Sequence, residues 1–126
     1  MLKMIPLGAV NRNLRIPTFA RDGRKASDLH ADTAVRIDGE SLLAHKVDVF
    51  WHGQQPSQDM KIHLPSAFYN MMTQMVRTDE RSEVRRSDLK TSGDSLVFDA
   101  KSSTGRLVGR VRTLLFSSAN QKVTGP

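Results

Sequence analysis

Three arginines near the C-terminus have the residue type and spacing to bind a polyanion. Arg106, Arg110 and Arg112 lie in the segment RLVGRVRTLLF (residues 106–116), among apolar residues and without an acid. Alternate residues of a strand share a face, so an extended segment would place all three guanidinium groups on one side. Arg110 and Arg112 would be about 7 Å apart at ordinary strand rise. This spacing suits successive phosphates of an extended nucleic-acid strand, which arginine binds through two parallel hydrogen bonds.

The positive charge of the chain is concentrated at its two ends. The net charge is +6 over 126 residues. Residues 1–21 and 101–126 carry four and five basic side chains and no acid, whereas residues 22–100 carry ten basic and thirteen acidic ones. If the ends meet in the fold, they form one basic face. The basic residues expected to support the three arginines are Lys101, Arg12, Arg15, Arg24 and Lys25.

An ordinary structural role accounts for the arginine segment equally well. A charged strand can face solvent, or it can protect the edge of a sheet from aggregation. Acids on neighbouring strands would then offset the repulsion between the guanidinium groups. The candidates for such acids are Glu83, Asp88 and Asp99.

Aromatic residues bear on the kind of nucleic acid that this face would bind. Proteins that bind single strands stack bases on exposed aromatic rings beside a basic groove. Phe116 and Tyr69 are the candidates for stacking, although aromatic residues make up only 6% of the chain. No helix-turn-helix pattern is present, so the sheet and its loops would bind through the backbone charge, without sequence specificity.

Motifs for catalysis or metal binding are absent from the sequence. The chain has no cysteine, its four histidines lack ligand spacing, and its serines and glycines form neither a nucleophile elbow nor a phosphate-binding loop. We therefore expect no catalytic residues, no metal and no cofactor. A small enzyme stays a third hypothesis, because catalytic groups can converge from anywhere in a fold.

One segment shows helical periodicity. After Pro65, with Ser66 as the N-cap, apolar residues recur at helical spacing and predict a principal helix at about residues 66–77. Its buried stripe would consist of Phe68, Met71, Met72, Met75 and Val76. Tyr69 falls off this stripe and is expected to be exposed.

The remaining segments alternate or carry turn signals, as strands do. Asp38-Gly39 predicts a hairpin whose second strand buries Leu43, His45, Val47, Val49 and Trp51. Residues 79–90 fit either a second helix or a strand, and we prefer the strand because 95–100 needs a neighbour. The expected fold class is α+β, a mainly antiparallel sheet of about six or seven strands, curled or barrel-like, with one principal helix.

These features lead to one predicted function and one alternative. The length predicts a single domain over residues 1–126, with a loose polar tail at 117–126. The lack of cysteine and of a long apolar run favours a cytoplasmic protein without a membrane partner. We expect a non-enzymatic domain that binds nucleic acid, with single strands favoured. The alternative is an interaction or assembly subunit, such as a homo-oligomer in a phage or mobile-element particle, whose basic ends contact acidic protein surfaces.

Overall fold

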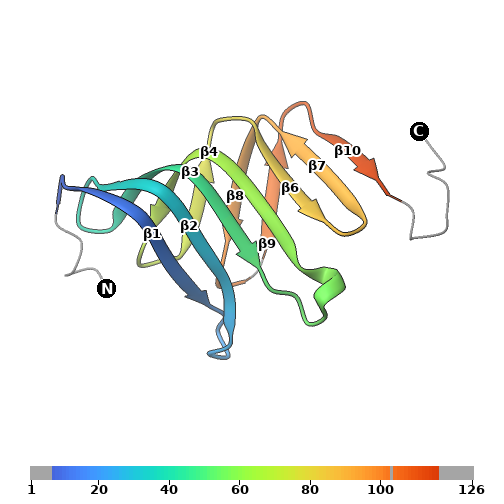
Figure 1. Cartoon of the computed structure of the whole chain (residues 1–126), viewed down its shortest axis with the longest axis horizontal. Helices are drawn as coiled ribbons and strands as arrows, with labels where there is room; N and C mark the ends of the chain where they lie inside the picture. The colour runs from blue at the N-terminus through green and yellow to red at the C-terminus, as the bar shows by residue number, and fades with distance from the viewer. Residues whose placement is uncertain (1–6, 103, 117–126) are drawn as a thin grey trace.

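Antiparallel strands make up almost all of the protein. The computed structural model describes residues 7–102 and 104–116. Its ten strands form one sheet (Figure 1), and the helical part of the described chain is a single 3-10 turn at Pro56–Gln58. The strands are β1 (Val10–Phe19), β2 (Lys25–Arg36), β3 (Ser41–Trp51), β4 (Met60–Asn70), β5 (Met75–Thr78), β6 (Ser82–Arg86), β7 (Leu89–Gly93), β8 (Ser95–Asp99), β9 (Thr104–Val108) and β10 (Arg112–Leu115).

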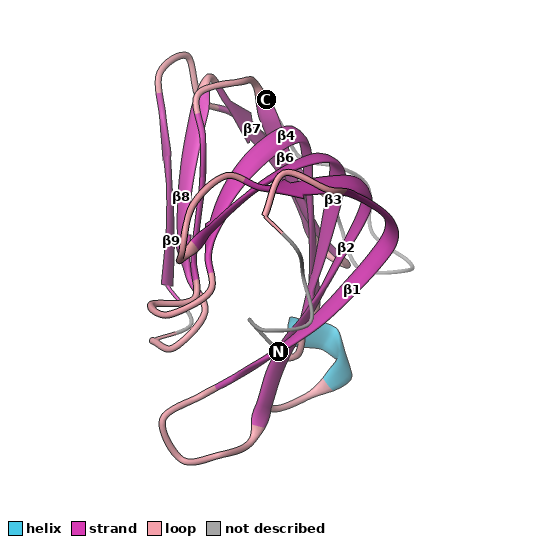
Figure 2. Cartoon of the chain, turned by 90° about the vertical axis from the view of Figure 1, so that its left-hand side faces the viewer, coloured by secondary structure: helices cyan, strands magenta, loops and turns pink. Residues whose placement is uncertain are grey.

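The sheet divides into two walls at β4. The first half of β4 pairs with β6, and the second half pairs with β5. The first wall therefore continues through β6, β7 and β10, and the second wall continues through β5, β8 and β9. The long strands β1–β4 contribute one half to each wall. Seen along the molecule, the walls meet at the top and separate below, like the two sides of a trough (Figure 2).

A line of irregular residues marks where the four long strands bend from one wall to the other. Asn13, Asp32, Lys46 and Pro65 lie side by side at the same level of β1–β4, and the regular cross-strand pairing skips all four. Asn13 and Lys46 have positive φ angles of 54° and 53°. Pro65 suits this level because it has no N–H to contribute to a ladder. We call this line the ridge.

The extra residue at the ridge shifts the inward-facing positions of each strand by one. In β3, Leu42 and Ala44 are buried before the ridge, and Val47 and Val49 are buried after it. A bulge bends its strand and interrupts the two-residue alternation. Because all four strands carry an irregularity at the same level, their pairing resumes in register beyond it. Both walls can therefore turn their apolar faces inward.

Three connections continue the ridge beyond β4. Residues 79–81 join β5 to β6, Asp94 joins β7 to β8, and residues 109–111 join β9 to β10. Each connection carries the chain from one wall to the other. The ten strands thus make seven passes over the same ridge.

The α+β prediction is wrong, because the described chain is all β with ten strands instead of six or seven. Residues 66–70 complete β4, a turn follows, and Met75–Thr78 form β5, so the expected helix at 66–77 is a hairpin. The apolar residues at helical spacing are the two strands and the turn of that hairpin. Residues 79–90 are extended and not helical, but they form a connection, β6, a turn and the start of β7 instead of one strand. The reason for preferring a strand was wrong, because β8 pairs with β5 and β9 and not with this segment.

Two other expectations about local structure need correction. In β3 the buried residues before the ridge are Leu42 and Ala44, whereas His45 is exposed, because the bulge at Lys46 reverses the faces. RLVGRVRTLLF is not one strand: β9 ends at Val108, and Gly109 and Arg110 turn the chain with φ angles of 83° and 42°.

The buried apolar residues form a hydrophobic cluster that draws on both walls. The single-domain organisation stays a prediction, and the predicted tail at 117–126 lies outside the described residues. No helix within the described ranges is long and apolar enough to cross a membrane.

Replacing Lys46 with glycine tests the bend at the ridge. A side chain in the left-handed region costs roughly 1 kcal/mol or more, which glycine avoids. We expect Lys46→Gly to raise the free energy of unfolding by about 1 kcal/mol in denaturant titrations. Arg15→Gly, in a regular part of β1, is the matched control and should lower it by about 0.5–1 kcal/mol. Equal losses in both variants would contradict the assigned bend.

Candidate functional site

The inner faces of the two walls carry the buried hydrophobic cluster of the described chain. One inner row crosses the first wall through Ile16, Leu29, Val49, Ile62 and Val84. An inner row of the second wall passes through Leu42, Tyr69, Val76 and Phe98. All of these side chains are buried, and none carries a charge. Such a lining can hold an apolar chain by burial without directional bonds.

The buried hydroxyl groups of the described interior are hydrogen-bonded, whereas the buried indole N–H of Trp51 has no partner among the described residues. The hydroxyl groups of Thr18 and Ser27 are hydrogen-bonded across β1 and β2. Thr78 Oγ1 accepts the Glu80 amide, and Ser82 Oγ donates to the Glu80 carbonyl. The middle of the trough is therefore left to apolar side chains.

Both ends of the sheet present unpaired strand edges together with exposed apolar side chains. No described strand pairs with the outer edge of β1, nor with the outer edges of β9 and β10. Exposed strand edges are templates for pairing with another chain. The large exposed apolar residues at the β1 end include Leu7, Val10, Phe19 and Ile37, and those at the other end include Val108, Val111, Leu114, Leu115 and Phe116.

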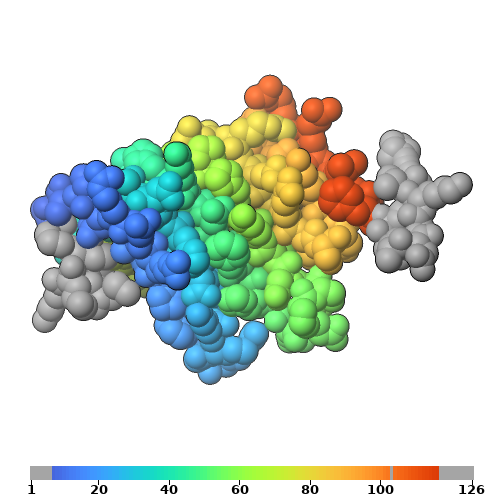
Figure 3. Space-filling view, in the orientation of Figure 1, coloured from blue at the N-terminus to red at the C-terminus, as the bar shows by residue number. Residues whose placement is uncertain are grey.

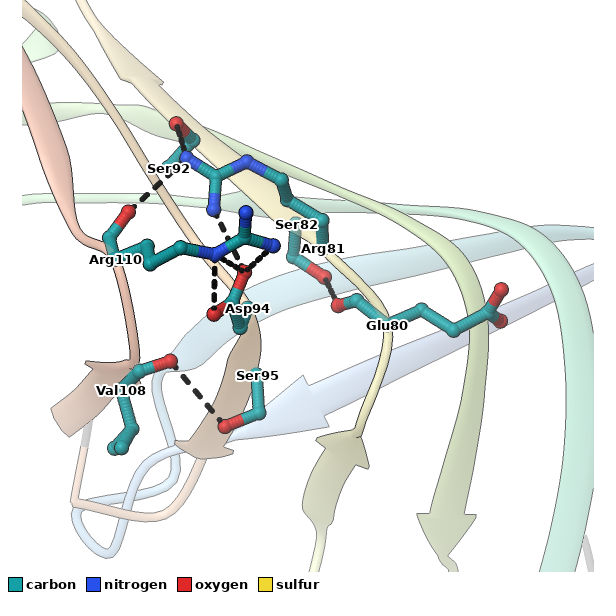
Figure 4. Close-up of polar contacts among 8 residues, drawn as sticks. All are labelled: Glu80, Arg81, Ser82, Ser92, Asp94, Ser95, Val108 and Arg110. Carbon is teal, nitrogen blue, oxygen red and sulfur yellow. Dashed lines mark hydrogen bonds and ion pairs between the residues drawn. The ribbon is translucent and has the colours of Figure 1, made fainter.

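A carboxylate holds the three ridge connections together (Figure 4). Asp94 accepts hydrogen bonds from Arg110 Nε and Nη2 at 2.9–3.2 Å and from Arg81 Nη1 at 2.9 Å. Arg81 Nη2 also donates to Ser92 Oγ and to the carbonyl of Arg110, each at 3.1 Å. Gly109 lies so close that a Cβ there would be 2.9 Å from Asp94 Oδ2. We call Asp94, Arg81 and Arg110 the ridge clamp.

Two arginines from the basic ends of the chain lie at opposite edges of the first wall. One outer row runs from Arg15 on β1 to Arg112 on β10, through His30, Asp48, His63, Glu83 and Ser92. Six inter-strand steps of about 4.8 Å separate its two arginines, roughly 29 Å along the sheet. The intervening groups include the acids Asp48, bonded to His63 at 2.8 Å, and Glu83, paired with Arg85. Arg15 and Arg112 therefore do not contribute to one basic patch on this face.

The structure does not bring the ten residues expected to form one site together, although Arg24 and Lys101 border a common hollow. Arg12, Arg15, Lys101, Arg106 and Arg112 are exposed and make no hydrogen bond or ion pair through their side chains with the described residues. Arg110 is in the ridge clamp, Lys25 pairs with Asp28 at 2.7 Å, and Arg24 lies 3.9 Å from Asp22. Phe116 is partly exposed.

Tyr69, the other expected stacking residue, lies inside the trough. It is only 3% exposed, and burial raises the pKa of its phenol to about 12. The prediction that it is exposed is wrong, because β4 alternates Ala67 and Tyr69 inward and leaves Phe68 at the surface.

The inner rows are the residues that sequence reasoning did not assign to a site. Their signal is present as two-residue alternation on either side of each ridge residue. The extra residue at the ridge reverses that alternation. One uninterrupted alternation along β3 therefore predicts Leu43 and His45 as buried before the ridge, where Leu42 and Ala44 are buried instead.

Comparison with known proteins identifies the family. A family model described as lipopolysaccharide-assembly, LptC-related, matches residues 16–115. The chain belongs to this family. Among solved structures, it resembles LptH, described as the LptA-homologous periplasmic component of the conserved lipopolysaccharide transport device of Pseudomonas aeruginosa. The TM-score is 0.55 at 14% identity, covering 98% of this chain and 90% of that one, which shows a shared fold. A search of curated proteins gave no match.

The family overturns the expected function, partner and location. The LptC-related family is one of lipopolysaccharide assembly, so the prediction of nucleic-acid binding is wrong, as is the alternative of a phage or mobile-element assembly subunit. The cytoplasmic location is also wrong, because it does not fit a member of the lipopolysaccharide-assembly family. The arginines misled the interpretation because Arg15 and Arg112 lie at distant edges and Arg110 is paired with Asp94.

Neutralising Asp94 tests the ridge clamp. Hydrogen bonds from Arg110, and then from Arg81, hold the pKa of Asp94 below its ordinary value of 3.8. Because folding lowers this pKa, ionised Asp94 stabilises the folded state above pH 3.8. This contribution is lost as the pH falls through the lowered pKa and Asp94 becomes protonated. We expect Asp94→Asn to have a lower Tm than the unmodified protein at pH 7, with the difference shrinking below pH 3.8.

Asp79→Asn is the control for this experiment. Asp79 is an exposed carboxylate of the same ridge and makes no hydrogen bond or ion pair with the described residues. Its substitution should leave the Tm nearly unchanged. A Tm difference for Asp94→Asn that does not depend on pH would contradict the clamp.

Proposed function

We propose that this protein is a non-enzymatic component of lipopolysaccharide transport that holds the acyl chains of lipopolysaccharide between its two walls. The observation that carries the proposal is the pair of uncharged, apolar inner faces that oppose each other below the ridge. Membership of the lipopolysaccharide-assembly family supports the same substrate. No covalent chemistry is required, because the trough only has to accept and release an apolar chain.

The free energy for this binding comes from burial. Each methylene group that leaves water contributes about 0.8 kcal/mol. The inner side chains pack against one another in the structure, so the walls must move apart before acyl chains can enter between them. The walls are joined at the ridge, where the described interactions are polar, and opening below the ridge therefore leaves the ridge contacts in place.

The location and the partners follow from the same assignment. The solved neighbour is a periplasmic component of a transport device, and we assign this chain to the same compartment. The unpaired edges of β1 and of β9 and β10 would then receive strands of other components, since an added strand satisfies exposed backbone groups. Such pairing would extend the apolar trough from one protein into the next.

Photo-crosslinking tests where the lipid lies. A photoreactive amino acid replaces either Val49, which faces into the trough, or its neighbour Phe50, which faces outward. With purified lipopolysaccharide, we expect a covalent adduct from position 49 and little or none from position 50. Equal adducts from both positions would place the lipid outside the trough and contradict the proposal.

Substitution of an exposed edge residue tests the partner interaction. Leu115 is 63% exposed at the end of β10, so Leu115→Asp should leave the fold intact. We expect binding to a neighbouring transport component to weaken by about tenfold, because the partner would bury an aspartate instead of a leucine. Phe68→Asp, at an exposed site away from the edges, is the control, and equal weakening by both would argue against edge docking.

A further inference from the structure

A hollow of about 520 Å³ lies at the end of the trough where the two walls approach each other. It is lined by the β1–β2 turn, the loop after β3, the end of β6 and the β8–β9 turn. The β1–β2 turn and the β3–β4 loop project from the lower side of the molecule in Figure 3. On the β1 side the walls are joined by a 3.1 Å hydrogen bond from the Phe19 amide to Gln74 Oε1. The hollow is thus bounded by elements of both walls.

Three cations from separate elements line this hollow, and no acid does. Arg24 comes from the β1–β2 turn, Arg86 from β6 and Lys101 from the β8–β9 turn. Lys101 makes no ion pair with the described residues, and Arg24 is 3.9 Å from its nearest acid, Asp22. Asp22 and Asp88 offset the charges of Arg24 and Arg86 from outside the lining. The charge of Lys101 has no such partner among the described residues, so an anion in the hollow would offset it.

Arg86 is the cation best fixed in position. Asp88 accepts hydrogen bonds from its Nε at 2.5 Å and its Nη2 at 2.9 Å, which leaves Nη1 for another acceptor. Arg86 lies two residues after the buried Val84 in β6, so the two side chains are on the same, inward face of the first wall. A charged residue on this face at the end of an apolar row needs a polar ligand or water beside it.

Uncharged donors add to the lining. Gln54, Gln58 and Ser102 also border the hollow. Trp51 lines it as well, and its buried indole N–H has no hydrogen-bond partner among the described residues. An indole nitrogen can only donate, and a buried donor without an acceptor is costly. The lining therefore supplies donors and positive charge, which is what an oxyanion requires.

The hollow is continuous with the apolar interior. Trp51 and Met60 both line it and pack against the hydrophobic cluster of the trough. A ligand that enters both regions must have an apolar chain and, at its end, an anionic group. We propose that this hollow binds a phosphate group of the lipopolysaccharide anchor while the acyl chains lie between the walls. This inference rests on the proposed function.

Trp51, the only tryptophan of the chain, provides the measurement. Its fluorescence is followed during titration with lipid A in its phosphorylated form, with dephosphorylated lipid A carrying the same acyl chains, and with inorganic phosphate. We expect the phosphorylated lipid to bind about tenfold more tightly than the dephosphorylated one, as charge-assisted hydrogen bonds would provide. Inorganic phosphate should bind far more weakly, since it lacks the acyl chains.

Charge-reversal variants identify the residues responsible. Arg24→Glu and Lys101→Glu should remove the preference for the phosphorylated lipid and leave affinity for the dephosphorylated lipid unchanged. Arg77→Glu makes the same charge change on an exposed residue of β5 outside the hollow, and it should keep the preference.

The outcomes separate this inference from the proposed function. Equal binding of both lipids to the unmodified protein, or a preference that survives both substitutions, overturns the phosphate site and leaves acyl-chain binding intact. Inorganic phosphate that binds as tightly as the phosphorylated lipid indicates a site for the free ion and overturns the headgroup assignment. Failure of both lipids to bind overturns the proposed function itself.

Discussion

The coincidence of four irregular residues at one level of the sheet is the constraint on which the rest of the structure depends. A strand exposes alternate residues to opposite faces, so a strand bent over a ridge keeps its apolar residues inside only if the alternation shifts at the bend. Asn13, Asp32, Lys46 and Pro65 provide that shift together. A shift in one strand alone would leave its two halves out of register with its neighbours. The trough therefore requires all four positions at once.

Beyond β4 the same bend is made by connections instead of bulges, and side chains replace the missing backbone pairing. Ser66 donates to Glu80, Arg81 binds Asp94, and Asp94 binds Arg110, so polar contacts link each pass over the ridge to the next. The ridge is thus polar where the trough is apolar. This division suits a protein whose walls separate to admit a lipid, because the contacts that join the walls are distinct from those that the lipid would replace.

The distribution of charge has a structural explanation that differs from the one first inferred. Arg15 and Arg112, from the two acid-free ends of the sequence, lie at opposite edges of the outer row of the first wall, with acids between them. The cations that do converge are Arg24, Arg86 and Lys101, which belong to three turns or strand ends. The clustering of basic residues along the sequence reflects arginines at the edges of the sheet. The cations of the hollow come from residues that are far apart in sequence.

The sequence by itself determined the local pattern of the strands. Val47 and Val49 face inward, as alternation predicted, and Asp38-Gly39 turns β2 into β3. Only the tertiary structure decided that residues 66–77 form a hairpin. The apolar residues of the two short strands and their turn have helical spacing in the sequence, and pairing with β3 and β8 makes the segment extended. It also decided that Asp94 is the acid opposite Arg110, since that contact joins two connections that only the ridge brings together. Alternation is a property of neighbouring residues, whereas the bend, the clamp and the hollow depend on which strands meet.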